Sequence, residues 1–273
     1  MNYISNRPTT ITTQRLREMK QQGKYISCIT AYDASMAKIF EEAGVDLILV
    51  GDSLANVFQG KDTTLSVTLE EIIYHTKIVK SAVSIPLVVA DMPFMSYQIS
   101  CDEAVRNAGI LLKETRCNAV KLEGCTSKIL NSIKCMDEIG IPVMGHIGLT
   151  PQSINKFGTY RVRGTDNEEA NKIIEDAIKL EQAGVFAIVL EKIPSLLAKD
   201  ISQSVNIPTI GIGAGKYCDG QILVCNDMLG INVDFKPRFV RHYANLYEII
   251  KGAVQSYTTD IKNNSFPNDN ESY

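Results

Sequence analysis

Short apolar runs that alternate with amphipathic stretches constrain the fold of this chain more than any other feature. The runs are apolar nearly throughout, which is typical of strands buried on both faces. They are Tyr25–Thr30, Asp46–Val50, Pro86–Ala90, Ala119–Leu122, Pro142–Met144, Phe186–Leu190, Pro208–Ile212 and the weaker Gln221–Val224. Helical spacing predicts helices at Ala34–Ala43, Leu69–Ala82, Asp102–Thr115, Ser127–Ile139, Glu168–Ala183 and Leu196–Val205. This alternation predicts a parallel α/β sheet that closes into a barrel.

The length fits one such barrel. A (β/α)8 TIM barrel typically needs about 250 residues, and this chain has 273. We expect a single catalytic domain over residues 1–257, with an extra N-terminal helix and a C-terminal helix at Arg238–Thr258. Residues 258–273 are polar and are expected to form a disordered tail.

Charge and cysteine content exclude several classes of protein. The net charge is −3, and a chain without a basic excess is a poor general binder of nucleic acid. The N-terminus is polar and no window reaches 18 apolar residues, so we expect no signal peptide, no membrane partner and a cytoplasmic protein. Seven scattered cysteines without a Cys-x-x-Cys pair indicate reduced, buried residues and neither a disulfide framework nor a zinc site. They are Cys28, Cys101, Cys117, Cys125, Cys135, Cys218 and Cys225.

Polar side chains of catalytic types stand where the apolar runs end. They are Asp52, Ser53, Asp91, Lys121, Glu123, His146 and Glu191. In a parallel barrel the carboxyl ends of all strands meet at one rim, where the active sites of barrel enzymes are built. Lys121 and Glu123 are two residues apart, so both point to the same face of their strand. The sequence therefore predicts one site at this rim.

Three of these residues are acids on three different strands, namely Asp52, Asp91 and Glu123. One such acid alone is most simply a helix N-cap at a strand–helix turn. Three carboxylates close together repel one another unless a cation neutralises them. Oxygen ligands without a His/Cys cluster favour a hard ion, with Mg²⁺ before Ca²⁺ or Zn²⁺. We therefore expect a magnesium site.

Glu191 has two interpretations. It follows the sixth apolar run, where it fits either a general base or a salt-bridge partner of Lys192 or Lys121.

The other two histidines do not stand at strand ends as His146 does. His75 lies inside a predicted helix and His242 inside the last one, so both are expected to be structural or solvated.

At these residues the chain resembles the ketopantoate hydroxymethyltransferase family. Seven matching blocks run in order from about residue 9 to 255. They are Ile29–Asp33, Val50–Leu54, Thr64–Thr68, Ala90–Met95, Val120–Gly124, Gly145–Ser153, and Gly211–Gly215 together with Asp219–Gln221. Each block alone is weak, whereas seven in order at the family spacing are a strong signal. Ser66 stands where the family usually has proline, and Asn226 where a histidine is common.

The resemblance implies a (β/α)8 barrel related to the isocitrate lyase and phosphoenolpyruvate mutase group. It implies Mg²⁺-dependent transfer of a hydroxymethyl group from 5,10-methylenetetrahydrofolate to 3-methyl-2-oxobutanoate through a metal-stabilised enolate. The product is 2-dehydropantoate, in the first step of pantothenate biosynthesis. It also implies a homo-oligomer, often a decamer.

The family's functional residues match by motif. Asp52, Asp91 and Glu123 match its magnesium ligands, and Glu191 matches its proton acceptor. The substrate contacts match Asp52, Ser53, Asp91, Lys121 and His146.

Three other functions remain open at this stage. A lyase or mutase would use the same barrel and metal, although such lyases commonly carry Cys-Gly-His where this chain has Met144-Gly145-His146. A Schiff-base aldolase would use Lys121 as nucleophile, which requires a lowered lysine pKa. A non-enzymatic binding barrel would leave the acids, the lysine and the histidine without a role.

Overall fold

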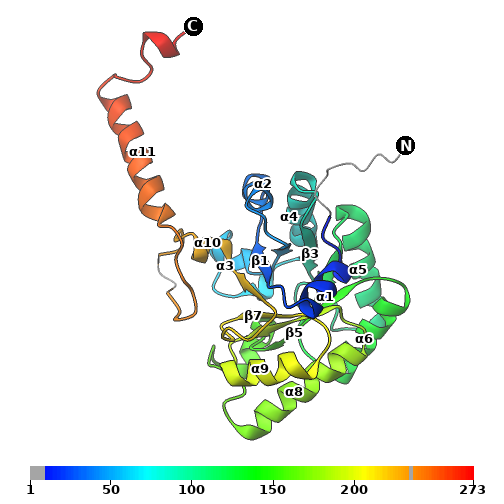
Figure 1. Cartoon of the computed structure of the whole chain (residues 1–273). Helices are drawn as coiled ribbons and strands as arrows, with labels where there is room; N and C mark the ends of the chain where they lie inside the picture. Colours follow the sequence, from blue (N-terminus) through cyan, green and yellow to red (C-terminus); the bar gives the residue numbers. More distant parts are fainter. Residues whose placement is uncertain (1–9, 234–235) are drawn as a thin grey trace, which may run out of the picture. The chain divides into compact units, whose positions relative to one another are not determined.

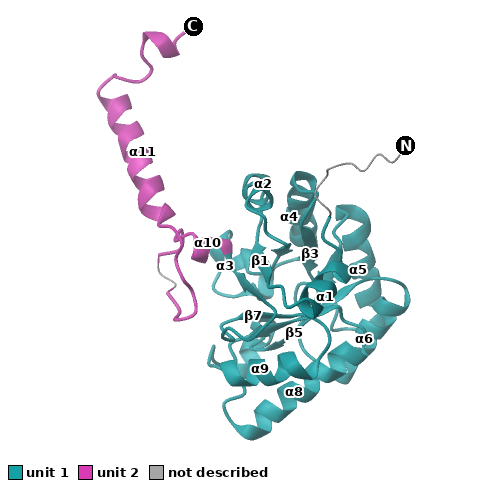
Figure 2. Cartoon of the chain, viewed as in Figure 1, with its two compact units in different colours: residues 1–224 teal, residues 225–273 magenta. Residues whose placement is uncertain are grey.

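The computed structural model describes residues 10–233 and 236–273, so the polar segment 1–9 lies outside the described residues. The chain divides into two compact units at Val224 and Cys225 (Figure 2). The first unit holds every strand, and the second holds the C-terminal helices.

The first unit is a closed barrel of eight parallel strands (Figure 1). The strands are β1 (Ile26–Thr30), β2 (Leu47–Val50), β3 (Leu87–Asp91), β4 (Ala119–Lys121), β5 (Val143–Gly148), β6 (Ala187–Glu191), β7 (Thr209–Ile212) and β8 (Gly220–Leu223). Pairing of β1 with β8, with Ile26 opposite Gly220, closes the sheet. The predicted TIM barrel is confirmed, and the weak eighth run is a strand.

The helices predicted from the apolar spacing are present, together with the short helices α3 and α7, which were not predicted. They are α1 (Thr13–Gln21), α2 (Ala34–Glu42), α3 (Leu54–Val57), α4 (Leu69–Ala82), α5 (Cys101–Thr115), α6 (Ser127–Glu138), α7 (Ile154–Phe157), α8 (Asn167–Gln182) and α9 (Ser195–Ser204). Side-chain caps begin several of them, because an N-cap oxygen satisfies a free amide of the first turn. Thr68, for example, forms a reciprocal capping box with Glu71 at the start of α4.

The extra N-terminal helix α1 belongs to the barrel's core. Its Leu16 and Met19 are buried in one apolar cluster with the first residues of several strands, including Ile26, Leu47 and Leu87. Because first residues lie at the amino ends of parallel strands, α1 packs against that end of the barrel. The apolar core therefore fills the amino end and leaves the carboxyl end to polar side chains.

The second unit contains α10 (Cys225–Met228), α11 (Leu246–Lys262) and the short 3-10 helix η3 (Asp269–Glu271). The predicted C-terminal helix is present, but it begins at Leu246 rather than at residue 238, and His242 lies in the exposed segment before it. No residue of α11 is buried. The division into a domain over 1–257 and a polar tail stays a prediction.

One expectation about the cysteines was wrong. Cys101 and Cys135 form a disulfide, whereas the spacing indicated only reduced cysteines. The two residues lie 34 positions apart on α5 and α6, which pack side by side. Consecutive outer helices of the barrel pack against each other. The spacing of residues along one segment does not show which cysteines this packing brings together. The other five cysteines are thiols, and four of these are buried.

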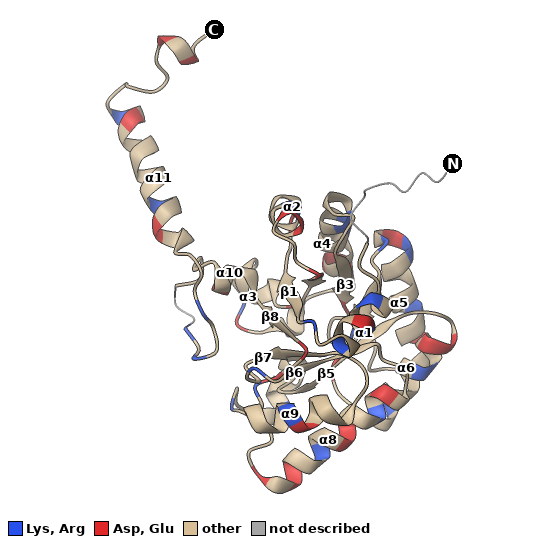
Figure 3. Ribbon diagram, viewed as in Figure 1, with Lys and Arg blue, Asp and Glu red and all other residues tan. Residues whose placement is uncertain are grey.

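The outer helices carry charges of both signs. Acidic and basic residues alternate along α8, where Lys172 and Lys179 pair with Asp176 and Glu175 (Figure 3). Within the described residues, no helix is long and apolar enough to cross a membrane.

We predict that Gly148→Ala lowers the free energy of unfolding by about 1–3 kcal/mol more than Gly44→Ala. Both glycines have a positive φ, at +93° and +81°, which disfavours any side chain. A Cβ at Gly148 would also overlap the carbonyl oxygen of Glu191, while a Cβ at Gly44 meets no atom within 4 Å. Urea denaturation of both variants measures the difference, and equal losses would contradict the packing role of Gly148.

Candidate active site

The strand ends place the expected residues at the carboxyl end of the barrel. Asp91 ends β3 and Lys121 ends β4, and the two are opposite each other in the register of the sheet. His146 lies on β5, and Glu191 ends β6 opposite Gly148. Because neighbouring strands end at the same level, their last side chains lie within contact distance of one another.

These side chains form a continuous series of contacts. Lys121 Nζ lies 2.8 Å from both carboxylate oxygens of Asp91 and 3.7 Å from Glu123 Oε1. His146 continues the series, with Nδ1 3.2 Å from Glu123 Oε1 and Nε2 3.4 Å from Glu191 Oε2. All are buried except Glu191, whose side chain is 16% exposed. The sequence-predicted acids, lysine and histidine therefore lie in one cluster.

Asp52 and Ser53 join this cluster from the loop after β2. The backbone amide of Asp52 donates a 3.2 Å hydrogen bond to Asp91 Oδ2. Ser53 Oγ lies 2.9 Å from the hydroxyl of Tyr32. The lack of a side chain at Gly51 leaves room for Ser53 and Asp91 beside it. A Cβ at Gly51 would lie 2.9 Å from Ser53 Oγ and 3.7 Å from Asp91 Oδ2.

Lys121 is held as an ammonium ion. Burial alone would lower its pKa, but the charges of Asp91 and Glu123 outweigh burial and raise the pKa above its ordinary value. A Schiff-base nucleophile requires a neutral amine at working pH. The geometry therefore disfavours the aldolase alternative, in which Lys121 would attack the substrate.

The three carboxylates have unequal environments. Burial, reinforced by the charges of Asp91 and Glu123, raises the pKa of Asp52 to about 8. Burial also raises the pKa of Asp91, against the opposing effect of Lys121. Glu123 is buried as well, but the neighbouring charge of His146 lowers its pKa. The metal-free site thus disfavours the negative charge of Asp52 and of Asp91 and favours that of Glu123.

His146 is a buried cation between two carboxylates. Burial disfavours its charged form, but Glu123 more than offsets this and raises its pKa to about 9. Both ring nitrogens lie within ion-pair distance of a carboxylate, yet neither contact has the alignment of a hydrogen bond. The ring is therefore held by the charges of Glu123 and Glu191.

The carboxylate oxygens of the cluster are suitable ligands for a divalent cation. Their arrangement, however, does not form a complete set of metal ligands. Within residues 10–233 and 236–273, no group of three His, Cys, Asp or Glu side chains is placed to hold a metal ion. The ammonium of Lys121 lies beside Asp91 and Glu123 and neutralises part of their charge. Burial and the charges of Asp91 and Glu123 disfavour the charged form of Asp52, a form that a divalent cation would favour, and carboxylate oxygens are hard donors that suit Mg²⁺.

Sequence reasoning missed two buried residues of the site, Gln152 and Tyr97. Gln152 lies in the 3-10 helix η2 (Pro151–Ser153) and bonds to both Asp52 and Glu123. Tyr97 lies in the loop after β3 and bonds to Gln152. Gln152 falls inside one of the motif blocks, which was the available signal, but it does not stand at a strand end.

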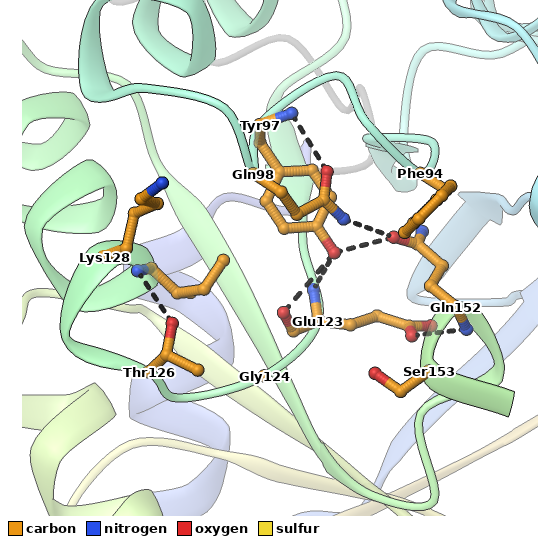
Figure 4. Close-up of a pocket in the computed structure, with 10 residues that line it drawn as sticks. Phe94, Tyr97, Gln98, Glu123, Gly124, Thr126, Lys128, Gln152 and Ser153 are labelled. Carbon is orange, nitrogen blue, oxygen red and sulfur yellow. Dashed lines mark hydrogen bonds between the residues drawn. The ribbon is translucent and has the colours of Figure 1, made fainter. Parts of the chain in front are cut away.

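A small pocket adjoins the cluster on the side of these two residues (Figure 4). Its volume is about 180 Å³. Its lining residues are Phe94, Tyr97, Gln98, Glu123, Gly124, Thr126, Lys128, Ile129, Gln152 and Ser153. Glu123 thus borders both the charged cluster and an opening beside it.

We predict that stability in the presence of a chelator falls as the pH rises from 6.5 to 9, and that His146→Gln removes much of this fall. Below pH 6.5 His146 is protonated in both states, so its ion pairs contribute fully. Between pH 6.5 and 9 only the folded state keeps the proton, and above 9 the contribution is lost. The contribution of His146 to the free energy of unfolding should fall by an amount on the order of 3 kcal/mol between pH 6.5 and 9. Urea denaturation across this pH range measures the fall.

The control for this experiment is His242→Gln, because His242 is an exposed histidine outside the barrel unit. We expect its pH profile to match that of the wild type. An unchanged profile in His146→Gln would contradict the ion pairs of His146.

Comparison with known proteins gives close relatives over almost the whole chain. The model of the family described as ketopantoate hydroxymethyltransferase matches residues 10–269. A protein of Chlorobaculum parvum is 55% identical over 100% of this chain and 99% of its own length. A protein of Chlorobium phaeobacteroides is 57% identical over 96% of each chain. Both carry the name 3-methyl-2-oxobutanoate hydroxymethyltransferase.

Solved structures support the fold. Phosphonopyruvate hydrolase in complex with oxalate and Mg²⁺ has a TM-score of 0.61 at 14% identity and covers 96% of this chain and 93% of its own. For 2,3-dimethylmalate lyase, a member of the PEP mutase/isocitrate lyase superfamily, the TM-score is 0.60 at 13% identity, with coverage of 97% and 93%. At such identities the likeness concerns the barrel alone. By its sequence matches, the chain belongs to the ketopantoate hydroxymethyltransferase family and is a transferase.

Proposed function

We propose that this chain transfers a hydroxymethyl group from 5,10-methylenetetrahydrofolate to 3-methyl-2-oxobutanoate and forms 2-dehydropantoate, for pantothenate biosynthesis. The observation that carries the proposal is the series of charged side chains from Asp91 to Glu191 at the carboxyl end of the barrel, which the backbone amide of Asp52 joins at Asp91. The names of the close relatives support the substrate and the pathway.

In this proposal Asp52, Asp91 and Glu123 hold Mg²⁺. When bound, the ion would polarise the 2-oxo group of the substrate and so make the neighbouring C–H more acidic. Lys121 remains protonated beside Asp91 and neutralises negative charge that develops on the substrate's oxygens. Ser53 and His146 complete the contacts to the substrate, and Asp52 and Asp91 serve both the ion and the substrate.

Glu191 is the proposed general base. Its carboxylate ends β6 and is partly exposed, so it can accept the C3 proton of the substrate and later release it to water. The electron pair left on C3 then forms a bond to the one-carbon unit of the folate. That carbon bridges two folate nitrogens, and both C–N bonds break. Water supplies the hydroxyl group, and the two nitrogens take up the proton removed from C3 and the remaining proton of the water. His146 lies against Glu191 and maintains the orientation of its carboxylate.

We also propose a cytoplasmic homo-oligomer, with the decamer taken from the family resemblance. Helix α11 supports self-association, because it carries a row of exposed apolar residues at spacings of three and four. The row is Tyr247, Ile250, Val254, Tyr257 and Ile261. An apolar row of this kind is typical of a helix that packs against another chain.

We predict that turnover requires a divalent cation and that Asp52→Asn abolishes it while stabilising the metal-free fold. Asparagine keeps the shape of the side chain and removes its repulsion with Asp91 and Glu123. Because folding raises the pKa of Asp52 to about 8, the wild type loses stability as the pH rises from about 4 to 8, and the variant escapes this loss. The stability gain should therefore be larger at pH 8 than at pH 5.

Loss of 3-methyl-2-oxobutanoate in the presence of 5,10-methylenetetrahydrofolate measures turnover, with EDTA and then with added Mg²⁺. Denaturation in EDTA measures the stability. The control is Glu175→Gln on the exposed face of α8, which should behave as the wild type. Full wild-type turnover in excess EDTA would disprove the requirement for a cation.

We predict that Glu191→Gln slows deuterium exchange at C3 of 3-methyl-2-oxobutanoate by roughly a hundredfold or more, the usual contribution of a positioned base. Glutamine keeps the size of the side chain but cannot accept the proton. The assay omits the folate, so it isolates removal of the proton from transfer of the carbon. Calorimetry should show nearly unchanged binding of the 2-oxo acid. Exchange at the wild-type rate would exclude Glu191 as the base.

A further inference from the structure

Gln152 is a buried amide whose polar groups all have partners inside the site. Its side chain is 5% exposed. Residue 152 follows β5 in the helix η2, and it lies between the charged cluster and the pocket beside it (Figure 4). A polar side chain buried this deeply is stable only when its hydrogen bonds are made, so its partners define its role.

Two of these partners are carboxylates from different strands. The backbone amide of Gln152 donates a 3.0 Å hydrogen bond to Glu123 Oε2. Its side-chain Nε2 donates to Asp52 Oδ2 at 2.9 Å and to the carbonyl oxygen of Met92 at 3.0 Å. Asp52 and Glu123 are 71 positions apart in the sequence, and this one residue connects them by its backbone and by its side chain.

Tyr97 determines which way the amide of Gln152 faces. The tyrosine hydroxyl donates a 2.7 Å hydrogen bond to Gln152 Oε1 and accepts a 3.0 Å hydrogen bond from the backbone amide of Glu123. Gln98 donates to the same oxygen at 3.1 Å. A flipped amide would place Oε1 against the carboxylate of Asp52 and the carbonyl of Met92, which are both acceptors. The observed orientation is therefore the only one that satisfies the network.

We propose that Gln152 is a positioning residue, which with Tyr97 sets the placement of the Asp52 and Glu123 carboxylates for the divalent cation. The proposal rests on the proposed function, since it takes these two acids as ligands of the ion. Each acid has one oxygen bound to Gln152, which fixes the rotation of its carboxylate. Such fixed orientation by a neighbouring hydrogen bond raises the affinity of a metal site.

The chemistry requires an amide at this position. A glutamate would place a fifth carboxylate in the cluster, and its oxygens would face the acceptor oxygens of Asp52 and Met92. A methionine has similar length but donates no hydrogen bond, so Asp52 would lose its buried donor. Only glutamine presents a donor to Asp52 and an acceptor to Tyr97 from the same side chain.

Binding of Mn²⁺ to the substrate-free protein tests the proposal, with free Mn²⁺ followed by electron paramagnetic resonance. We expect Gln152→Met to weaken Mn²⁺ binding by about 10–100-fold, the usual effect of removing a partner of a metal ligand. Tyr97→Phe removes one hydroxyl and should weaken binding less. Its effect should shrink further in the Gln152→Met background, because the two residues act through one network. A purely structural role would not produce this coupling in affinity.

Glu175→Gln is the control. Glu175 lies on the exposed face of α8 and pairs with Lys179, so this variant should bind Mn²⁺ with the affinity of the wild type. Thermal unfolding verifies that each variant is folded. If Gln152→Met does not fold, Tyr97→Phe decides, and wild-type affinity in that variant would overturn the proposal.

The outcomes separate this proposal from the proposed function. Strong Mn²⁺ binding by the wild type and equal binding by Gln152→Met would overturn the role of Gln152 alone. Absence of Mn²⁺ binding by the wild type would overturn the cation site itself, and the role of Gln152 with it.

Discussion

The buried ion pair between Lys121 and Asp91 is the interaction on which the arrangement of the site depends. Both residues are nearly inaccessible, and the ammonium contacts both carboxylate oxygens at 2.8 Å. Loss of either partner would leave an uncompensated buried charge, which typically costs about 3–5 kcal/mol. The pair joins the ends of β3 and β4. Asp52 then bonds to Asp91, and Glu123 lies beside Lys121, so the other acids are placed relative to this pair.

The barrel separates stability from chemistry by position. At the amino end, Leu16 and Met19 of α1 pack with the first residues of the strands in an apolar cluster. At the carboxyl end, burial and the charges of Asp91 and Glu123 raise the pKa of Asp52 to about 8, so ionisation of Asp52 costs stability as the pH rises. Apolar packing at the amino end stabilises the barrel and offsets the repulsion between like charges at the carboxyl end. A cation bound there would relieve that repulsion.

Local patterns predicted most of the fold because they reflect local physics. Buried strands read as short apolar runs, and even the weak run before Val224 is a strand, since β8 must pair with β1 to close the barrel. The start of α11 was predicted eight residues early, at Arg238 rather than Leu246, because Val240 and Tyr243 before the helix continue its apolar spacing. The disulfide of Cys101 and Cys135 was missed because it depends on how α5 and α6 pack.

The sequence by itself determined the barrel, the rim and the identity of the charged residues, because strand ends and side-chain alternation follow from spacing along the chain. It also placed Lys121 and Glu123 on one face through their separation of two residues. Only the tertiary structure decided which atoms meet. Gln152 bonds to Asp52 across 100 positions and Tyr97 to Gln152 across 55. Such contacts depend on the register of neighbouring strands and on closure of the sheet, and no pattern within a single segment encodes them.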